Sequence, residues 1–173
     1  EVGLVFRQQK QYPEAIAEFQ WALKQEPGHI RARNQLARCL LDTGQTDAAV
    51  AEYGRVLESE PNEVEALLGM GVALIKKGEY EKAVTHLLRA KSQEPERGEI
   101  HFHLGLCYDL TNRLLKAAEA YQEAMRLDST LSEAYFNLAV IYNGEERLAD
   151  AEKLYQKSIS LKPDFAEAYN NLG

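Results

Sequence analysis

The chain has 173 residues, of which 45% are hydrophobic and 27% charged, a composition typical of a soluble globular protein. Its net charge of −7 disfavours a nucleic-acid partner, because binding to phosphates needs a basic surface. No apolar run approaches the roughly 20 residues that cross a membrane, and 2 cysteines cannot build a disulfide framework or a four-ligand zinc site. The compartment stays open, with the cytoplasm slightly favoured.

A step of 34 residues recurs along the chain without an insertion. It joins four prolines, with Ser129 in the one missing place: Pro27, Pro61, Pro95 and Pro163. It joins alanines without exception: Ala15, Ala49, Ala83, Ala117 and Ala151. It also joins a large series and a small series: Phe19, Tyr53, Leu87, Tyr121 and Tyr155, and Gly3, Ala37, Gly71, Gly105, Ala139 and Gly173. Such a period predicts an array of stacked structural repeats.

From its N-terminus, the chain is predicted to open inside the first helix of an incomplete repeat, residues 1–29. Four complete repeats follow, at 30–63, 64–97, 98–131 and 132–165, and residues 166–173 begin another. Neither end has the polar capping helix that repeat arrays usually need. We therefore interpret the single array 1–173 as an internal fragment of a longer protein. The alternative is a short protein whose uncapped end is covered by a second copy.

Each repeat is predicted to form two helices. In repeat 64–97 the first helix spans Glu63 to Lys77, Gly78 ends it, and a second apolar set starts at Tyr80. One such pair cannot bury its apolar stripe alone, so neighbouring pairs must stack.

Two features of the repeat carry local predictions. The invariantly small positions, the Gly71 and Ala83 series, are expected where two helices cross closely, because only Gly or Ala lets the backbones approach. In repeat 132–165 the glycine comes early, at Gly144, and Glu146 takes its usual place. We therefore expect the first helix of that repeat to end early or to kink.

The 34-residue period, the Leu104–Gly105 pair, the alanine at repeat position 20 and the proline at position 32 resemble the tetratricopeptide repeat. Residues 166–173 (AEAYNNLG) and 131–142 (LSEAYFNLAVIY) match the first-helix pattern of that family closely. The resemblance covers the whole chain. It implies an all-α, right-handed α-solenoid of antiparallel helix pairs that binds its partners in a concave groove.

In the family, defined positions of the first helices line this groove. The resemblance gives that role to the following residues: Asn34, Gln35, Arg38, Leu68, Val72, Ile75, Phe102, His103, Leu106, Phe136, Asn137, Val140, Asn170 and Asn171. The apolar members from Leu68 to Val140 are expected to form one contiguous patch, and exposed apolar patches usually mark a partner. The alternative is that they pack on adjacent first helices and are mostly covered.

Position 6 of the repeat suggests a partial ladder of amides. Asn137 and Asn171 match an asparagine ladder known in the family, Gln35 and His103 are polar substitutes, and Gly69 interrupts the series. An amide side chain both donates to and accepts from a peptide backbone. The cationic clamp with which some members hold a C-terminal carboxylate has no match here. Position 2 holds four acids: Glu65, Glu99, Glu133 and Glu167. They either serve only the helix N-terminus or also favour a neutral or basic peptide over an acidic one.

Five further residues could suggest chemistry. His101 and His103 point about 200° apart on a helix, so they cannot chelate one metal ion, and His101 is expected in the core. Cys39 and Cys107 share repeat position 10 and are read as small buried hydrophobes with free thiols. Trp21 has polar equivalents and should lie on an outward-facing helix. It is either a lone exposed aromatic, a residue packed under chain that precedes Glu1, or an outer contact.

We expect a protein-interaction scaffold that binds an extended peptide or an amphipathic helix. It is expected to have no enzyme activity, cofactor or metal, since no phosphate loop, nucleophile constellation or metal spacing is present. One alternative is that the array is the substrate-selecting arm of an enzyme whose catalytic domain lies outside this chain. A second is base-by-base reading of RNA, which the acidic charge disfavours. Self-association through the uncapped ends also stays open.

Overall fold

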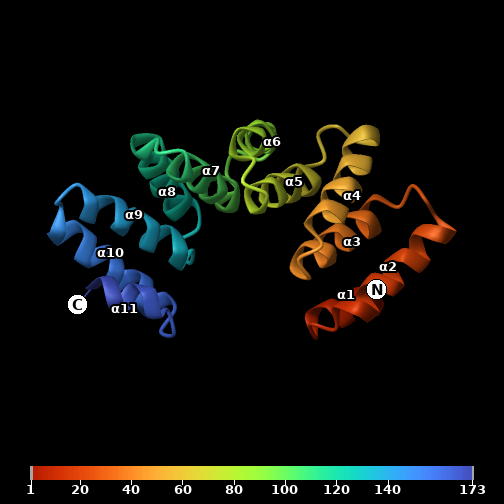
Figure 1. The fold of residues 1–173 in the computed structure, drawn as a ribbon, viewed down its shortest axis with the longest axis horizontal. Coiled ribbons are helices and arrows are strands. Elements are labelled where there is room, and N and C mark those ends of the chain that lie inside the picture. The colour runs from red at the N-terminus through yellow and green to blue at the C-terminus, as the bar shows by residue number, and fades with distance from the viewer. Residues whose placement is uncertain (1, 173) are drawn as a thin grey trace. The chain divides into compact units, whose positions relative to one another are not determined.

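The computed structural model describes residues 2–172, and every regular element in that range is a helix. The chain divides into two compact units, residues 1–93 and 94–173, which are described separately (Figure 1). Unit 1 contains α1 (Val2–Gln8), α2 (Tyr12–Gln25), α3 (Ile30–Asp42), α4 (Thr46–Ser59), α5 (Val64–Lys76) and α6 (Tyr80–Gln93). Unit 2 contains α7 (Gly98–Leu110), α8 (Leu114–Leu127), α9 (Ser132–Gly144), α10 (Leu148–Leu161) and α11 (Ala166–Leu172).

Consecutive helices pack as antiparallel pairs joined by short turns. In unit 1, α1 packs on α2, α3 on α4 and α5 on α6, and the second helix of each pair contacts the first helix of the next. In unit 2, α7 packs on α8 and α9 on α10, with α8 against α9 and α10 against α11. The predicted stacking of helix pairs is therefore confirmed within each unit.

The helix starts follow the 34-residue period. First helices begin at Ile30, Val64, Gly98 and Ser132, and each has 13 residues. The second helices α4, α6, α8 and α10 each have 14 residues. Most second helices carry an acid in their first turn, where the helix dipole favours it, and α2 has Pro13 there. Within residues 2–172, no helix is both long and apolar enough to span a membrane.

A left-handed residue two positions after the first helix shapes the turn in every repeat. These residues have φ between +58° and +78° and stand 34 apart: Lys10, Gly44, Gly78, Asn112 and Glu146. Two backbone hydrogen bonds recur at each turn. In the second turn, the amide of Gly44 donates to the Leu41 oxygen at 3.2 Å, and that of Gln45 to the Leu40 oxygen at 2.8 Å. This is the Schellman arrangement, which satisfies carbonyls at a helix end.

The expectation that the first helix of repeat 132–165 ends early or kinks is wrong. Helix α9 has the same 13 residues as its equivalents, and Gly144 is its last residue. Glu146 takes the left-handed position with φ +61°. Its amide donates to the Asn143 oxygen at 3.1 Å, and the Arg147 amide to the Tyr142 oxygen at 2.9 Å. The turn geometry therefore prevails over the residue type, and a glutamate adopts a conformation that glycine adopts at lower cost.

Small residues on the first helices lie beneath large residues of the second helices. A Cβ added at Gly71 would lie 2.7 Å from Leu87, and one added at Gly105 would lie 2.6 Å from the Tyr121 ring. At Gly3 it would lie 2.9 Å from the Phe19 ring. The expected close approach is therefore present, but what fills the space over the glycine is a side chain of the large series rather than backbone.

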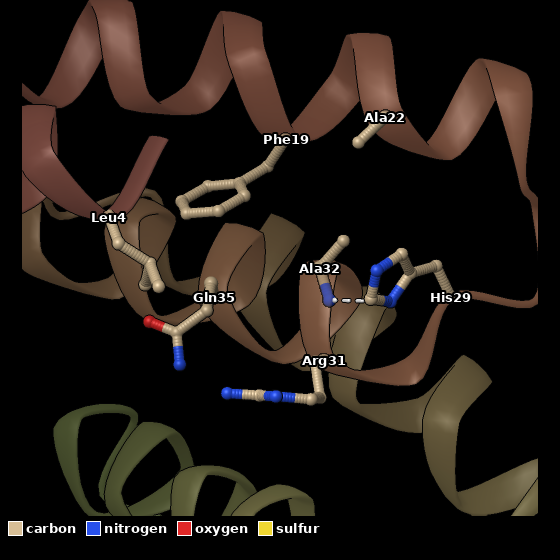
Figure 2. Close-up of a pocket in the computed structure, with 7 residues that line it drawn as sticks. All are labelled: Leu4, Phe19, Ala22, His29, Arg31, Ala32 and Gln35. Atoms are coloured by element: carbon tan, nitrogen blue, oxygen red, sulfur yellow. Dashed lines mark hydrogen bonds between the residues drawn. The ribbon is translucent and has the colours of Figure 1, made fainter. Parts of the chain in front are cut away.

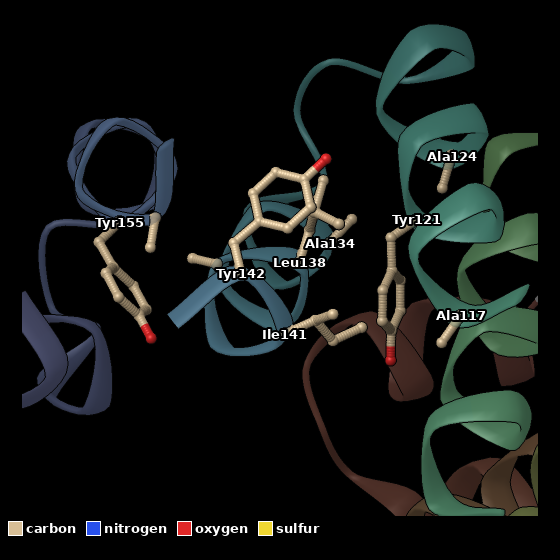
Figure 3. Close-up of a cluster of buried hydrophobic side chains, with 10 residues drawn as sticks. Ala117, Tyr121, Ala124, Ala134, Leu138, Ile141, Tyr142 and Tyr155 are labelled. Atoms are coloured by element: carbon tan, nitrogen blue, oxygen red, sulfur yellow. The ribbon is translucent and has the colours of Figure 1, made fainter. Parts of the chain in front are cut away.

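The core of unit 2 is built around α9. Figure 3 shows Leu138, Ile141 and Tyr142 on this helix, between Tyr121 on α8 and Tyr155 on α10. Alanines complete the cluster where the helices approach most closely: Ala117, Ala124, Ala134, Ala139 and Ala151. Unit 1 has an equivalent core of buried large residues: Phe19, Leu36, Tyr53, Val56, Leu67, Met70 and Leu87.

Candidate functional site

An apolar row lies on the first helices of unit 2, on the face that the repeat register assigns to the concave side. Phe102 and Leu106 stand one turn apart on α7, and Phe136 and Val140 stand one turn apart on α9. Phe102, Leu106 and Phe136 are half-buried against the core of unit 2, while Val140 is 41% exposed. These residues therefore pack on the fold and still present apolar surface.

Aromatic rings extend this row toward the C-terminal side. The Phe136 ring centroid lies 4.7 Å from that of Phe165 and 5.8 Å from that of Tyr155. The Phe102 ring lies 6.1 Å from the Tyr121 ring. Phe165 was not among the predicted groove residues. Its sequence signal is that the equivalents at repeat position 34 are mostly polar, and none is aromatic except a histidine: His29, Glu63, Arg97 and Leu131.

Asn137 stands beside the apolar row and is held by a polar chain. Its Nδ2 donates to the Tyr121 hydroxyl at 3.3 Å, and that hydroxyl donates to Asp109 Oδ2 at 3.4 Å. Burial raises the pKa of the Asp109 carboxyl, and the hydrogen bond from Tyr121 opposes the rise. The Asn137 amide is thus oriented by the core, and its oxygen has no partner in this chain of bonds.

Within each unit, position 6 of a repeat lies beside the large aromatic ring of the preceding repeat. A Cβ at Gly69 would lie 2.5 Å from Cε1 of Tyr53, so Tyr53 fills the space that any side chain would need. Asn137 bonds to Tyr121, and Asn171 lines a hollow of about 230 Å³ together with Tyr155. The interruption of the amide series at Gly69 therefore has a packing cause.

The two histidines of α7 have different surroundings. His101 is buried in the core as expected, with its Nε2 2.8 Å from the Pro95 carbonyl oxygen. His103 is half-buried with its ring centroid 5.2 Å from that of Phe102, and burial lowers its pKa. Among residues 2–172, no three histidine, cysteine or acidic side chains gather in a way that would hold a metal ion.

The predicted groove residues of unit 1 are more covered. Asn34 and Leu68 are 6% and 4% exposed, and Val72 and Ile75 are half-buried. Gln35 accepts a hydrogen bond of 2.7 Å from Arg7 Nη1. Arg38 is exposed, as are Asn170 and Asn171 on α11 of unit 2. Contact of any of these residues with a ligand stays a prediction.

A hollow of about 280 Å³ in unit 1 was not predicted. Figure 2 shows Leu4 and Phe19 on one side of it, and Arg31 and Gln35 projecting from α3. Ala22, His29 and Ala32 complete its lining. Of these residues only Gln35 was predicted to bind a ligand. The sequence contains a signal for Arg31, because this repeat position carries a positive charge only here, whereas its equivalents in the later repeats are all glutamates.

The remaining sequence interpretations concern single residues. Trp21 is 62% exposed on α2, which confirms that it faces outward. Cys39 and Cys107 are fully buried free thiols, as predicted. Leu115 was not singled out from the sequence, yet it is 77% exposed at the start of α8, where two other repeats have Asp47 and Glu81.

The stacked helix pairs and the 34-residue register define a helical-repeat protein. The chain belongs to the tetratricopeptide repeat family, whose models match residues 6–63, 44–104, 98–131 and 132–165. The last two ranges have the bounds of two predicted repeats. No curated protein sequence matches the chain.

Solved structures share the fold. TTC0263, a thermophilic TPR protein of Thermus thermophilus, is 25% identical with a TM-score of 0.81, over 99% of this chain and 93% of that one. PilF of Pseudomonas aeruginosa is 23% identical with a TM-score of 0.88, over 96% and 76% of the two chains. YrrB, described as a TPR protein with an unusual peptide-binding site, is 19% identical with a TM-score of 0.73, over 98% and 87%.

Proposed function

We propose that this chain is a non-catalytic protein-interaction scaffold, and that the first-helix face of unit 2 binds an extended peptide or an amphipathic helix. The observation that carries the proposal is the apolar row of Phe102, Leu106, Phe136 and Val140, which is partly exposed and lies beside the oriented amide of Asn137. Apolar side chains of a partner would pack on the row, and its backbone would bond to the Asn137 amide. YrrB supports the proposal only as a precedent, because the peptide-binding site described for it belongs to that protein.

The charge of this face favours a neutral or basic partner segment. Helices α7 and α9 contain no lysine or arginine and contribute Glu99, Asp109 and Glu133. Part of this charge is compensated, since Arg97 pairs with Glu99 at 3.0 Å and Lys162 pairs with Glu133 at 3.0 Å. We therefore expect lysine-containing peptides to bind more tightly than their glutamate counterparts, by a small factor that decreases with salt.

Selection of linear peptides on the immobilised chain, followed by affinity measurements on variants, tests the proposal. Phe136→Ala removes a ring that contacts two others, and the loss of such an anchor is worth about 2 kcal/mol, or roughly 30-fold in affinity. Because Phe136 also packs on the core, Val140→Glu serves as a second variant at an exposed position.

Lys157→Ala is the matched control, since Lys157 is exposed on the second helix α10 of the same unit. Arg89 is unsuitable as a control, because it donates to the Pro61 carbonyl oxygen. Circular dichroism establishes that each variant is folded. If Phe136→Ala and Val140→Glu stay folded and bind the selected peptides as tightly as Lys157→Ala does, this face is not the binding site.

A further inference from the structure

Helix α3 of unit 1 differs in charge from the other first helices. The equivalents of Arg31 at the 34-residue step are acidic: Glu65, Glu99, Glu133 and Glu167. The equivalents of Arg38 are apolar: Leu4, Val72, Leu106 and Val140. At two positions of the face that the register assigns to the concave side, this one helix therefore has a guanidinium group where its counterparts have a carboxylate or an aliphatic side chain.

Arg31 and Arg38 do not hold the described part of the fold together through hydrogen bonds or ion pairs. Arg33, between them, is structural: it bonds to Glu52 at 2.7 Å and to the Pro27 carbonyl oxygen at 2.6 Å. Arg31 and Arg38 are exposed, and neither makes a hydrogen bond or an ion pair within residues 2–172. Arg31 is the second residue of α3, where the positive end of the helix dipole disfavours a cation. Its position thus opposes helix stability rather than serving it.

The two guanidinium groups share one face of α3. Seven residues on an α-helix make nearly two full turns, so Arg31 and Arg38 are about 10.5 Å apart along the axis on the same side. Gln35 stands between them and is held by Arg7. Two acids lie near this face: Asp42, 3.9 Å from Arg7 Nε, and Glu65 on the neighbouring α5, which acts with Arg38, Asp42 and Arg7 on the buried Tyr53 hydroxyl. Because Arg7, Arg31 and Arg38 stand against these two carboxylates, the face has a net positive charge.

An apolar hollow adjoins this cationic face. The hollow of about 280 Å³ is lined by Leu4, Phe19 and Ala22 from α1 and α2, and by Arg31, Ala32 and Gln35 from α3 (Figure 2). A ligand that contacts Arg31 can thus place an apolar side chain against Phe19. The combination suits a segment that alternates carboxylates with apolar side chains.

We propose that the α3 face of unit 1 binds an acidic peptide segment, with two carboxylates on Arg31 and Arg38 and an adjacent apolar side chain in the hollow. This inference rests on the proposed function only in taking first-helix faces as binding faces, and it uses residues of the other unit. It confines the preference for neutral or basic partners to unit 2.

The spacing of the two arginines specifies the probe. In a polyproline II segment, residues three apart point to the same side and are about 9 Å apart, close to the separation of the arginines. The probe is a fluorescein-labelled peptide containing Glu-Leu-Pro-Glu, and fluorescence anisotropy with the full chain measures its affinity. Three comparison peptides replace both glutamates by glutamine, both by lysine, or the leucine by serine.

Arg31→Gln combined with Arg38→Gln is expected to lower affinity for the glutamate peptide about tenfold at low salt, and the loss should shrink as salt rises. Lys91→Gln, which removes the charge of an exposed lysine on the second helix α6 of the same unit, is the matched control and should change nothing. The glutamine, lysine and serine peptides should each bind more weakly. Equal binding by the double variant and the control would overturn the inference, and so would equal binding of the glutamate and glutamine peptides.

The Phe136→Ala variant separates this inference from the proposed function. It should leave binding of the acidic probe unchanged, because Phe136 belongs to unit 2. If Phe136→Ala abolishes binding of the probe while the arginine double variant does not, acidic segments bind unit 2, and the α3 proposal is wrong although unit 2 remains a binding site.

Discussion

Exchanging the residue types at the turn after α9 should stabilise the protein. Glu146 has φ +61°, whereas the same turn position is glycine in two repeats, with φ +78° at Gly44 and +76° at Gly78. The left-handed region destabilises the folded state by about 1–2 kcal/mol for a residue with a side chain. Glycine avoids this strain, but the larger entropy of its unfolded state offsets about 0.5–1 kcal/mol of the gain. Glu146→Gly should therefore raise the free energy of unfolding by about 1 kcal/mol.

Gly144 supplies the second half of the exchange. It is the last residue of α9, and a Cβ added to it would meet no atom within 4 Å. Because alanine favours a helix over glycine by nearly 1 kcal/mol in the interior and less at the end, Gly144→Ala should add about 0.5 kcal/mol. Together the two changes should raise the melting temperature by roughly 3–6 °C, using 2–4 °C per kcal/mol for a chain of this size.

Urea unfolding followed by circular dichroism measures the change, and hydrogen exchange at the Arg147 and Ala151 amides reports it locally, since repeat arrays need not unfold in one step. Glu145→Gly is the matched control, because Glu145 has φ −87° and gains nothing from glycine. If Glu146→Gly is no more stable than Glu145→Gly, the left-handed strain at this turn does not exist and the reasoning fails.

Three further predictions follow from packing and burial. Gly69→Ala should cost about 1–3 kcal/mol, because its Cβ would enter the space of the buried Tyr53 ring, and Tyr53→Leu in the same chain should recover part of this loss in urea unfolding. Burial raises the pKa of Cys39 to about 11 and that of Cys107 to about 12, so neither thiol should react with a disulfide reagent at pH 8 until urea unfolds the chain; rapid reaction of the native protein would contradict this. Burial also lowers the pKa of His86 and His103, so the unfolded chain takes up protons first, and stability present above about pH 6.5 should be lost as the pH falls toward 5. The urea midpoint of His103→Gln should decline less over that range, and an equal decline would count against a buried neutral His103.

The repeat register was predictable because it depends on the size of the side chain at each repeat position rather than on the identity of single residues. Small, large and proline series at a step of 34 fixed the helix pairs, and the structure confirms them at Gly71 under Leu87 and at Gly105 under Tyr121. The prediction for the turn after α9 is wrong, because a glycine does not by itself determine where a helix ends: Gly144 is the last residue of α9. The two Schellman hydrogen bonds hold that turn in the same geometry whatever residue occupies it.

The candidate site was predictable only in part. The family register placed Phe102, Phe136 and Asn137 on the first helices, but exposure depends on what packs over each residue. Asn34 and Leu68 have the same repeat position as the two phenylalanines and are almost completely covered. The bond from Asn137 to Tyr121 joins residues 16 apart on different helices, and the hollow beside Arg31 joins three helices. A local sequence pattern does not predict such contacts between different helices.

The contact between Tyr53 and Gly69 depends on the order in which the repeats follow one another along the chain. At these two junctions inside the units, a large residue of one repeat contacts position 6 of the next, and the two must match in volume: Tyr53 requires the bare backbone of Gly69, while Tyr121 has room for the amide of Asn137. Excising repeat 64–97 would bring the imidazole of His103 up to the ring of Tyr53. Although the repeats share one length and one architecture, they are not interchangeable modules, and a duplication or deletion at the level of the gene would need compensating changes at the new junction.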